Sequence, residues 1–250
     1  MEVVGRHLTD PQLLSLSVGE LESGASLVLG QGSPLLMGGL RPVPPNLVYC
    51  GMMQCRPARP LPADLQDLMD AATQGVVLVS FGSVLQGSQV INILYTYCTH
   101  LVHILYSSCT HLVLILNSSC THHPQVPAEQ KTALLSALGQ LKEKVLMKWE
   151  SDEMEGKPDN MIVRKFLPQQ DLLGHPNTKL FITHAGYLSF EESLCHKVPM
   201  IATPICYDQF DNAQEIVRLG IGKSIKFTEI TEENLSEALR EVCYLSYTTM

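Results

Sequence analysis

The chain has 250 residues, of which 45% are hydrophobic and 17% charged, and its formal net charge at pH 7 is −8. This length and composition are typical of a globular protein with one large domain or two small ones and a substantial buried core. The negative charge and the lack of a basic stripe argue against nucleic acid as a partner, because a nucleic-acid-binding surface has to neutralise phosphates.

The cysteines and the two ends of the chain carry further expectations. Eight cysteines are present without the paired spacing of a metal site, so we expect no bound metal and mostly free, buried thiols rather than a disulfide framework. Residues 1–11 contain charges and no apolar run, and residues 247–250 form no hydrophobic anchor. We therefore expect neither a signal peptide nor a membrane anchor in this sequence.

Residues 1–60 are rich in glycine, proline and serine, with only short apolar runs such as Ala25–Leu29. This composition predicts an irregular segment that ends in a proline-rich stretch. A short helix at Leu61–Ala72 follows, and the continuous apolar run Val76–Phe81 predicts a buried strand.

An 11-residue repeat then interrupts the pattern: Ile93–His100 recurs as Ile104–His111 and as Ile115–His122. Three copies of Cys-Thr-His suggest a metal site, but their near-identical spacers argue against it. The lack of acidic and basic residues suggests a membrane span, but the histidines and many hydroxyl side chains argue against that. A translated tandem DNA repeat is the best explanation, and we expect residues 88–124 to form a disordered or poorly packed loop.

After the repeat, apolar runs of strand length alternate with helical patterns. The predicted elements are a helix from Pro127 with Leu134, Leu138 and Leu141 on its apolar side, strands at Val145–Trp149, Met161–Arg164, Leu180–Ile182 and Val198–Ala202, and helices at Leu188–His196, Asp208–Leu219 and Thr231–Tyr244. This alternation predicts an α/β fold built on a parallel sheet.

Residues 161–212 contain the best candidate for a ligand site. In parallel α/β sheets ligands lie beyond the carboxyl ends of the strands, where Thr183–Gly186 and Tyr207–Gln209 fall. The helix after Gly186 directs unpaired N–H groups and its positive dipole end to the same place, which suits a phosphate. Glu192, one to two turns further along, can accept hydrogen bonds from ribose hydroxyls. These residues therefore predict a nucleotide-sugar site.

The same stretch resembles the signature of the UDP-glycosyltransferases, in particular the animal glucuronosyltransferases. The motifs that carry the resemblance are Phe166–Gln169, Asp171–Pro176, Thr183–Gly186, Glu192, Val198–Met200, and Asp208-Gln209 with Asn212. Many fixed spacings over about fifty residues make this signature far more specific than a lone glycine-rich loop. Segments within residues 20–87 and 125–243 agree with it, and the repeat between them does not.

The resemblance implies a Rossmann-like parallel sheet, the C-terminal domain of a GT-B glycosyltransferase. Residues 1–60 would be a remnant of the N-terminal half and the inter-domain linker. Residues 61–250 would be the UDP-sugar-binding domain, interrupted by residues 88–124.

The resemblance also implies contacts with the uridine. Phe166 would stack on uracil, Gln169 would meet uracil or ribose, and Glu192 would bind the ribose hydroxyls. Lys148 stands where the family has an arginine near the nucleotide. A core aromatic and a solvated lysine are the structural alternatives for Phe166 and Lys148.

The diphosphate would lie against His184 and Gly186, with further contacts from Ser83 and Ser189. An isolated core histidine and an ordinary turn are the alternatives for His184 and Ser83. Asp208 and Gln209 would hold the transferred sugar. The chain departs from the family pattern at Ala185, where a glycine is usual, and at Leu188, where an asparagine is common. His175 belongs to a turn motif and is expected to be structural.

The implied reaction is hexosyl or glucuronosyl transfer from a UDP-sugar, which is a co-substrate, to a small lipophilic acceptor, with no other cofactor. The resemblance assigns no catalytic residue to this sequence, because the family's base lies in an N-terminal half that we expect to be missing. The family resides at the endoplasmic reticulum membrane, and a homo-oligomer is compatible with it. Two alternatives are a non-catalytic UDP-sugar-binding module and a non-functional truncated product.

Overall fold

The computed structural model describes residues 24–34, 36, 42–82, 126–149 and 153–248, which fall into two compact units, Met1–Met53 and Gln54–Met250. Ser83 and the expected loop at residues 88–124 lie outside the described residues. The smaller unit contains two parallel strands, β1 (Val28–Gly30) and β2 (Leu47–Tyr49), with an antiparallel bridge between Gly32 and Gly51.

The larger unit is built on a six-stranded sheet in which every neighbouring pair is parallel, in the order β5-β4-β3-β6-β7-β8. The strands are β3 (Val76–Ser80), β4 (Lys144–Lys148), β5 (Met161–Arg164), β6 (Thr178–Thr183), β7 (Met200–Ala202) and β8 (Gly222–Ser224). All five residues of β3 are buried, as expected for a central parallel strand that is covered on both faces. The predicted α/β fold with a parallel sheet is confirmed.

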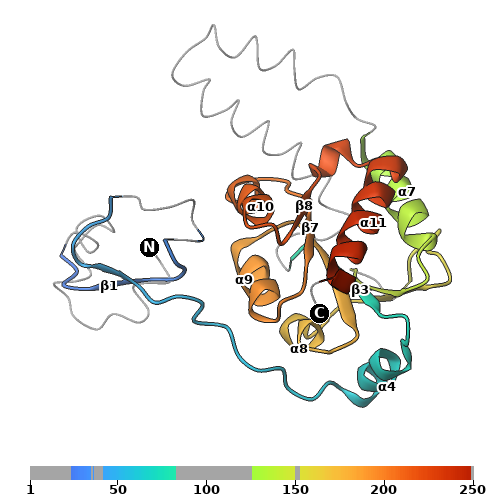
Figure 1. Ribbon diagram of the computed structural model, residues 1–250, viewed down its shortest axis with the longest axis horizontal. Helices are drawn as coiled ribbons and strands as arrows, with labels where there is room; N and C mark the ends of the chain where they lie inside the picture. The colour runs from blue at the N-terminus through green and yellow to red at the C-terminus, as the bar shows by residue number, and fades with distance from the viewer. Residues whose placement is uncertain (1–23, 35, 37–41, 83–125, 150–152, 249–250) are drawn as a thin grey trace, which may run out of the picture. The chain divides into compact units, whose positions relative to one another are not determined.

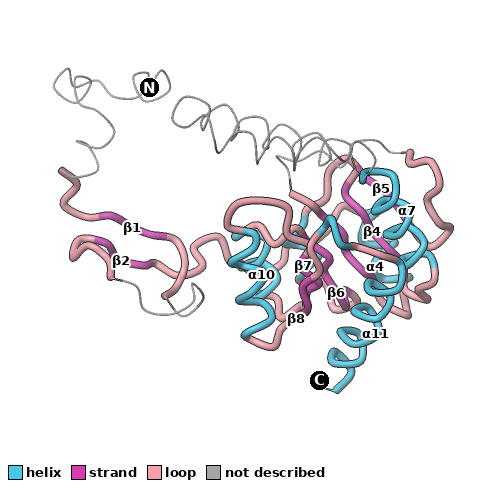
Figure 2. Tube along the Cα trace, turned by 90° about the horizontal axis from the view of Figure 1, so that it is seen from above, coloured by secondary structure: helices cyan, strands magenta, loops and turns pink. Residues whose placement is uncertain are grey.

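Helices cover both faces of this sheet. They are α4 (Ala63–Ala71), α7 (Val126–Gly139), α8 (Gln169–Leu173), α9 (Tyr187–Cys195), α10 (Gln209–Arg218) and α11 (Glu232–Thr248), with a 3₁₀ turn, η1, at Phe227–Glu229. Figure 1 shows α9 and α10 on one side of the strands and α7 and α11 on the other, and Figure 2 shows the same separation of α10 from α7 and α11. None of the helices in the described ranges has the length and apolarity that a membrane crossing needs.

The core lies between the sheet and the α7–α11 pair. Leu134 and Leu138 of α7 and Leu235 of α11 are at most 4% exposed, and they pack with side chains of β3, β4 and β6. Trp149 is half-buried against this core, with the Lys131 ammonium 5.7 Å from its ring centroid. The buried positions of Leu134 and Leu138 confirm the apolar side predicted for the first of these helices, whereas Leu141 lies beyond the end of α7 at Gly139.

The chain order gives the sheet a point where its direction of winding reverses. The chain runs outward from β3 to β4 and β5, then returns to the other side of β3 and continues through β6, β7 and β8. At that reversal Ser80, at the end of β3, lies opposite Thr183, at the end of β6. Crevices at such reversals, beyond the carboxyl ends of the strands, are the usual ligand sites of open α/β sheets.

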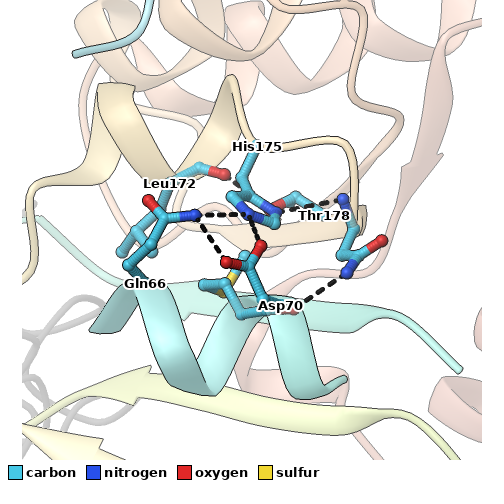
Figure 3. Close-up of polar contacts among 7 residues, drawn as sticks. Gln66, Asp70, Leu172, His175 and Thr178 are labelled. Atoms are coloured by element: carbon cyan, nitrogen blue, oxygen red, sulfur yellow. Dashed lines mark hydrogen bonds and ion pairs between the residues drawn. The ribbon is translucent and has the colours of Figure 1, made fainter. Parts of the chain in front are cut away.

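His175 serves a structural purpose, as expected. Its Nδ1 accepts the Asn177 backbone N–H at 3.2 Å, and its Nε2 lies 3.2 Å from Asp70 Oδ1 and 3.3 Å from the Gln66 amide nitrogen of α4. The Asn177 amide donates to the Met69 carbonyl at 2.8 Å. Figure 3 shows this polar cluster between α4 and the turn that follows α8. These bonds fix α4 to the edge of the domain, and His175 is not a ligand-binding group.

The expectation of mostly free, buried thiols was wrong: of the four cysteines whose side chains are described, two form a disulfide and neither of the other two is fully buried. Cys55 and Cys195 form a disulfide between Cα atoms 6.1 Å apart, across 140 residues of sequence. Among the described cysteines that are free, Cys50 is exposed and Cys206 is half-buried. Spacing alone could not reveal the bond, because the fold and not the sequence brings residue 55 to the end of α9.

Candidate functional site

A cavity of about 530 Å³ lies beyond the carboxyl ends of the central strands, at the point where the sheet reverses. This volume is within the usual range for small-molecule sites. Nine of the ten predicted site residues line it: Lys148, Phe166, Gln169, His184, Gly186, Ser189, Glu192, Asp208 and Gln209. The tenth, Ser83, lies outside the described residues. Segments that follow β3, β5, β6 and β7, together with the last residue of β4, therefore contribute to one cavity.

His184, directly after β6, forms one wall of this cavity. A Cβ atom on Gly186 would lie 2.5 Å from its Nε2, and one on Gly82 would lie 3.0 Å from the same atom. The two glycines therefore leave the space that the imidazole occupies. Burial lowers the pKa of His184, against the opposing influence of the Asp208 charge and of a hydrogen bond with the Ser80 backbone. The imidazole is thus neutral at pH 7 and acts as a hydrogen-bonding group.

The amino end of α9 faces the same cavity. Gly186 is the N-cap, with φ −59° and ψ 141°, and no side chain caps the helix. The first N–H groups of a helix have no partner within it, and the helix dipole adds positive potential there. Because Leu188 and Ser189 in this first turn line the cavity, their N–H groups are available to an anion.

The turn before α9 is held in an unusual conformation. Ala185 has φ +62°, in the left-handed region that disfavours residues with a Cβ, and its backbone N–H donates to Thr183 Oγ1 at 3.3 Å. Asn212 of α10 donates to the Ala185 carbonyl at 2.9 Å and to Asp208 Oδ2 at 2.8 Å. The position of the α9 amino end is therefore fixed from α10. We assigned no role to Asn212 from the sequence, although its place four residues after Asp208, on the same helix face, was a usable signal.

Gln169, Ser189 and Glu192 form a hydrogen-bonded group that also lines the cavity. The Gln169 amide donates to Glu192 Oε2 at 2.7 Å and to Ser189 Oγ at 3.1 Å. Burial raises the pKa of Glu192, while the Gln169 bond and the Arg56 charge lower it. A half-buried carboxylate oriented in this way is suited to accept hydrogen bonds from a pair of neighbouring hydroxyl groups.

Asp208 and Gln209 differ in how free their side chains are. Gln209 is 6% exposed, and its Oε1 accepts the backbone N–H groups of Ile205 and Cys206 at 2.8 and 3.0 Å. Its carbonyl therefore holds the loop after β7 in shape. Asp208 is exposed, and only its Oδ2 is used by Asn212, so it is the better placed of the two to meet a ligand hydroxyl.

Two structural alternatives are excluded. Phe166 is 76% exposed at the cavity, so it is not a core aromatic. Lys148 is half-buried, its pKa is lowered by burial, and its ammonium donates to the Gly82 carbonyl at 2.7 Å, so it is not a solvated lysine. Leu188 and Tyr207, 54% and 64% exposed, add apolar surface to the same cavity. No group of three or more histidine, cysteine, aspartate or glutamate side chains is arranged for a metal within the described ranges.

Comparison with known proteins gives a consistent result. The family model described as UDP-glucoronosyl and UDP-glucosyl transferase matches residues 35–90 and 101–247, so its second segment begins inside the repeat, where the motifs alone showed no resemblance. Human UDP-glucuronosyltransferase 1A5 is 31% identical over 228 residues, which are 91% of this chain and 35% of that protein. Human UDP-glucuronosyltransferase 1A9 is 30% identical over 81% of this chain and 31% of that protein.

Solved structures share the fold. A glycotransferase of kitacinnamycin aligns with a TM-score of 0.56 and 20% identity, over 92% of this chain and 49% of that chain. Os79 from O. sativa, in complex with UDP, aligns with a TM-score of 0.50 and 21% identity, over 74% of this chain and 35% of that chain. The chain spans about a third of the length of the human relatives it matches.

Proposed function

The chain belongs to the UDP-glucoronosyl and UDP-glucosyl transferase family, and on that basis we propose that its cavity binds the UDP-sugar donor of a glycosyl transfer reaction. The observation that carries the proposal is the convergence of nine predicted donor-site residues on one cavity at the sheet reversal. The solved relative with UDP bound has the same fold, which supports a site of this kind.

We assign the diphosphate to the amino end of α9. The backbone N–H groups of Leu188 and Ser189, in the first turn of α9, have no partner within the helix, and the neutral imidazole of His184 lies within reach of the same space. This arrangement neutralises phosphate with dipoles and hydrogen bonds and does not need a cluster of lysines and arginines. Lys148, whose ammonium donates to the Gly82 carbonyl, adds one positive charge to the cavity.

We assign the uridine to the part of the cavity that Gln169, Glu192 and Phe166 line. The Glu192 carboxylate would accept hydrogen bonds from the two ribose hydroxyls, while the Gln169 amide holds that carboxylate in place. The exposed ring of Phe166 offers an apolar face on which uracil can stack. Asp208 would bind a hydroxyl of the sugar through the oxygen that Asn212 does not use, whereas Gln209 would act mainly by shaping the loop.

The proposed reaction is hexosyl or glucuronosyl transfer to a small lipophilic acceptor. Inverting transfer requires a base to remove the acceptor proton and electrostatic stabilisation of the departing UDP. The groups around the amino end of α9 supply the second requirement. We propose that the base and the acceptor pocket belong to the part of the family fold that is not represented in this chain.

Isothermal titration of the chain with UDP, UDP-glucose and UDP-glucuronate tests the proposal, with saturable binding of UDP as the expected result. Glu192→Gln should weaken UDP binding about tenfold, since it replaces charge-assisted hydrogen bonds to the ribose with neutral ones. Glu229→Gln is the matched control, because Glu229 is exposed and pairs only with Lys226 on the surface. A well-folded chain indifferent to millimolar UDP would refute donor binding.

The same titrations separate the alternatives. A binding module is indicated if UDP-sugars bind but no UDP is released in the presence of a phenolic acceptor. A non-functional product is indicated if the folded chain binds none of the three nucleotides.

A further inference from the structure

The segment Gln54–Arg59, here called the strap, lies against the two short helices that carry the Gln169–Ser189–Glu192 group. Its residues do not line the cavity. At the end of α8, a Cβ atom on Gly174 would lie 2.4 Å from the Cβ atom of Ala58, so the strap approaches that helix closely. From the sequence we expected this segment to be only part of a linker.

The strap is joined to α9 at two points. The Gln54 amide donates to Glu191 Oε2 at 2.6 Å, and Glu191 is completely buried. Cys55 is bonded covalently to Cys195, the last residue of α9. Glu191 is adjacent to Glu192 in sequence, so the first of these contacts holds the turn of α9 that carries the predicted ribose ligand.

The strap is joined to α8 by a second set of bonds. The Arg56 guanidinium contacts both oxygens of Asp171, at 3.0 Å for the Nη2–Oδ2 pair, and the Arg59 backbone N–H donates to Oδ1 at 2.8 Å. These contacts lower the pKa of Asp171. The Gln170 amide donates to the Gln54 carbonyl at 2.9 Å. Gln170 and Asp171 directly follow Gln169, the residue that orients Glu192.

These contacts have one consequence for the site. The strap bridges α8 and α9 from outside, and Gln169 and Glu192 bond to each other across the same two helices on the cavity side. The distance between those two side chains therefore depends on how the strap holds the helices together. α8 is only five residues long, too short to be rigid without tertiary contacts.

We infer that the strap is a positioning element for the ribose-binding pair Gln169–Glu192, and that opening the Cys55–Cys195 disulfide weakens UDP binding without unfolding the domain. The inference rests on the proposed function. In the opening step a dithiol delivers two electrons and two protons to the bridge, which becomes two thiols, and the dithiol becomes its own disulfide.

The first test measures UDP affinity of the full chain by titration calorimetry, oxidised and after treatment with dithiothreitol. We expect reduction to weaken UDP binding about fivefold, the low end of ordinary coupling between sites. The variant Cys55→Ser/Cys195→Ser should show the weakened affinity from the start and should not respond to dithiothreitol. Cys50→Ser, which removes an exposed free thiol, should behave as the wild type.

The second test uses the reciprocal effect. If UDP binds the oxidised form about fivefold more tightly, saturating UDP must make the midpoint potential of the disulfide about 20 mV more negative, at 29.6 mV per tenfold. If the disulfide only stabilises the fold, reduction would lower the melting temperature, the UDP affinity would not change, and UDP would not shift the midpoint potential.

The third test keeps the disulfide and remains available if the serine variant does not fold. Arg56→Lys retains the charge but loses the bidentate contact with Asp171. Like reduction of the disulfide, it should weaken UDP binding. Arg218→Lys, which disturbs an arginine–carboxylate pair on the surface of α10, is its control and should have no effect.

The outcomes separate the two proposals. If the oxidised wild type does not bind UDP, the proposed function fails. If it binds UDP and the reduced form and Arg56→Lys bind equally well, the strap inference alone is overturned.

Discussion

Gly186→Ala isolates the steric requirement of the site. Gly186 has φ −59° and ψ 141°, which any residue adopts without strain, so the substitution introduces no backbone penalty. The new Cβ would lie 2.5 Å from His184 Nε2 and 2.9 Å from its Cε1. The ring cannot turn away freely, because Gly82 lies against it on another side. Overpacking of this kind costs about 1–3 kcal/mol of unfolding free energy, and displacing the ring should also weaken UDP binding.

Denaturant unfolding followed by circular dichroism measures this cost. In a His184→Ala background the clash has no partner, so Gly186→Ala should there cost less by most of that amount. Gly220→Ala is the control: Gly220 has φ +69° and nothing within 4 Å, so the variant should lose about 1–2 kcal/mol through backbone strain alone and keep its UDP affinity. Equal cost of Gly186→Ala in both backgrounds would refute the steric account.

Three further measurements test separate parts of the structure. Lys197→Gly should raise the unfolding free energy by about 1 kcal/mol in denaturant titrations, because Lys197 is exposed and has φ +60° just after α9. Asn212→Ala should lower it by about 1–3 kcal/mol in the same assay, since the buried Ala185 carbonyl loses its donor. UDP binding should be accompanied by proton uptake, seen as a dependence of the calorimetric heat on buffer ionisation enthalpy. Burial lowers the pKa of His184 in the free chain, and a bound diphosphate raises this pKa again. UDP affinity should therefore rise as the pH falls from the pKa of His184 in the complex to its lower pKa in the free chain. His184→Gln should remove this proton uptake.

The elements that the sequence predicted correctly share one property: each has a strong apolar pattern. The strand at residues 76–81 is a continuous apolar run that became the fully buried β3. The helix predicted at Leu188–His196 is α9, displaced by one residue at each end. For such elements burial of the apolar face dominates the local free energy, so the pattern determines the structure.

Two elements that the sequence did not predict, β8 and α8, lack this pattern, whereas β1 and β2 lie in short apolar runs of a segment that we expected to be irregular. β8 is Gly222-Lys223-Ser224, a short polar strand at the edge of the sheet. Its place beside β7 depends on the absence of a side chain at Gly222, whose Cβ would lie 2.1 Å from the Met200 carbonyl oxygen. α8 lies between Pro168 and Pro176, in a stretch that is otherwise typical of a turn. Tertiary contacts stabilise both elements, and no local window contains those contacts.

The candidate site divides in the same way. Its phosphate side consists of backbone N–H groups and a histidine at the ends of central strands, and this side follows directly from a strand–turn–helix pattern in sequence. Its ribose side depends on two helices held by a segment more than one hundred residues earlier in the chain, through Arg56–Asp171 and Cys55–Cys195.

The separate roles of the two parts of the site can be tested by comparing UDP with uridine, because uridine lacks the diphosphate. A disturbance of the strap acts on Gln169 and Glu192 and should weaken uridine and UDP by the same factor. A disturbance at Gly186 acts on His184 and the α9 amino end and should weaken UDP far more than uridine. If both kinds of variant weakened the two ligands in the same ratio, the cavity would respond as a single unit, and the separate roles assigned to its two sides would be wrong.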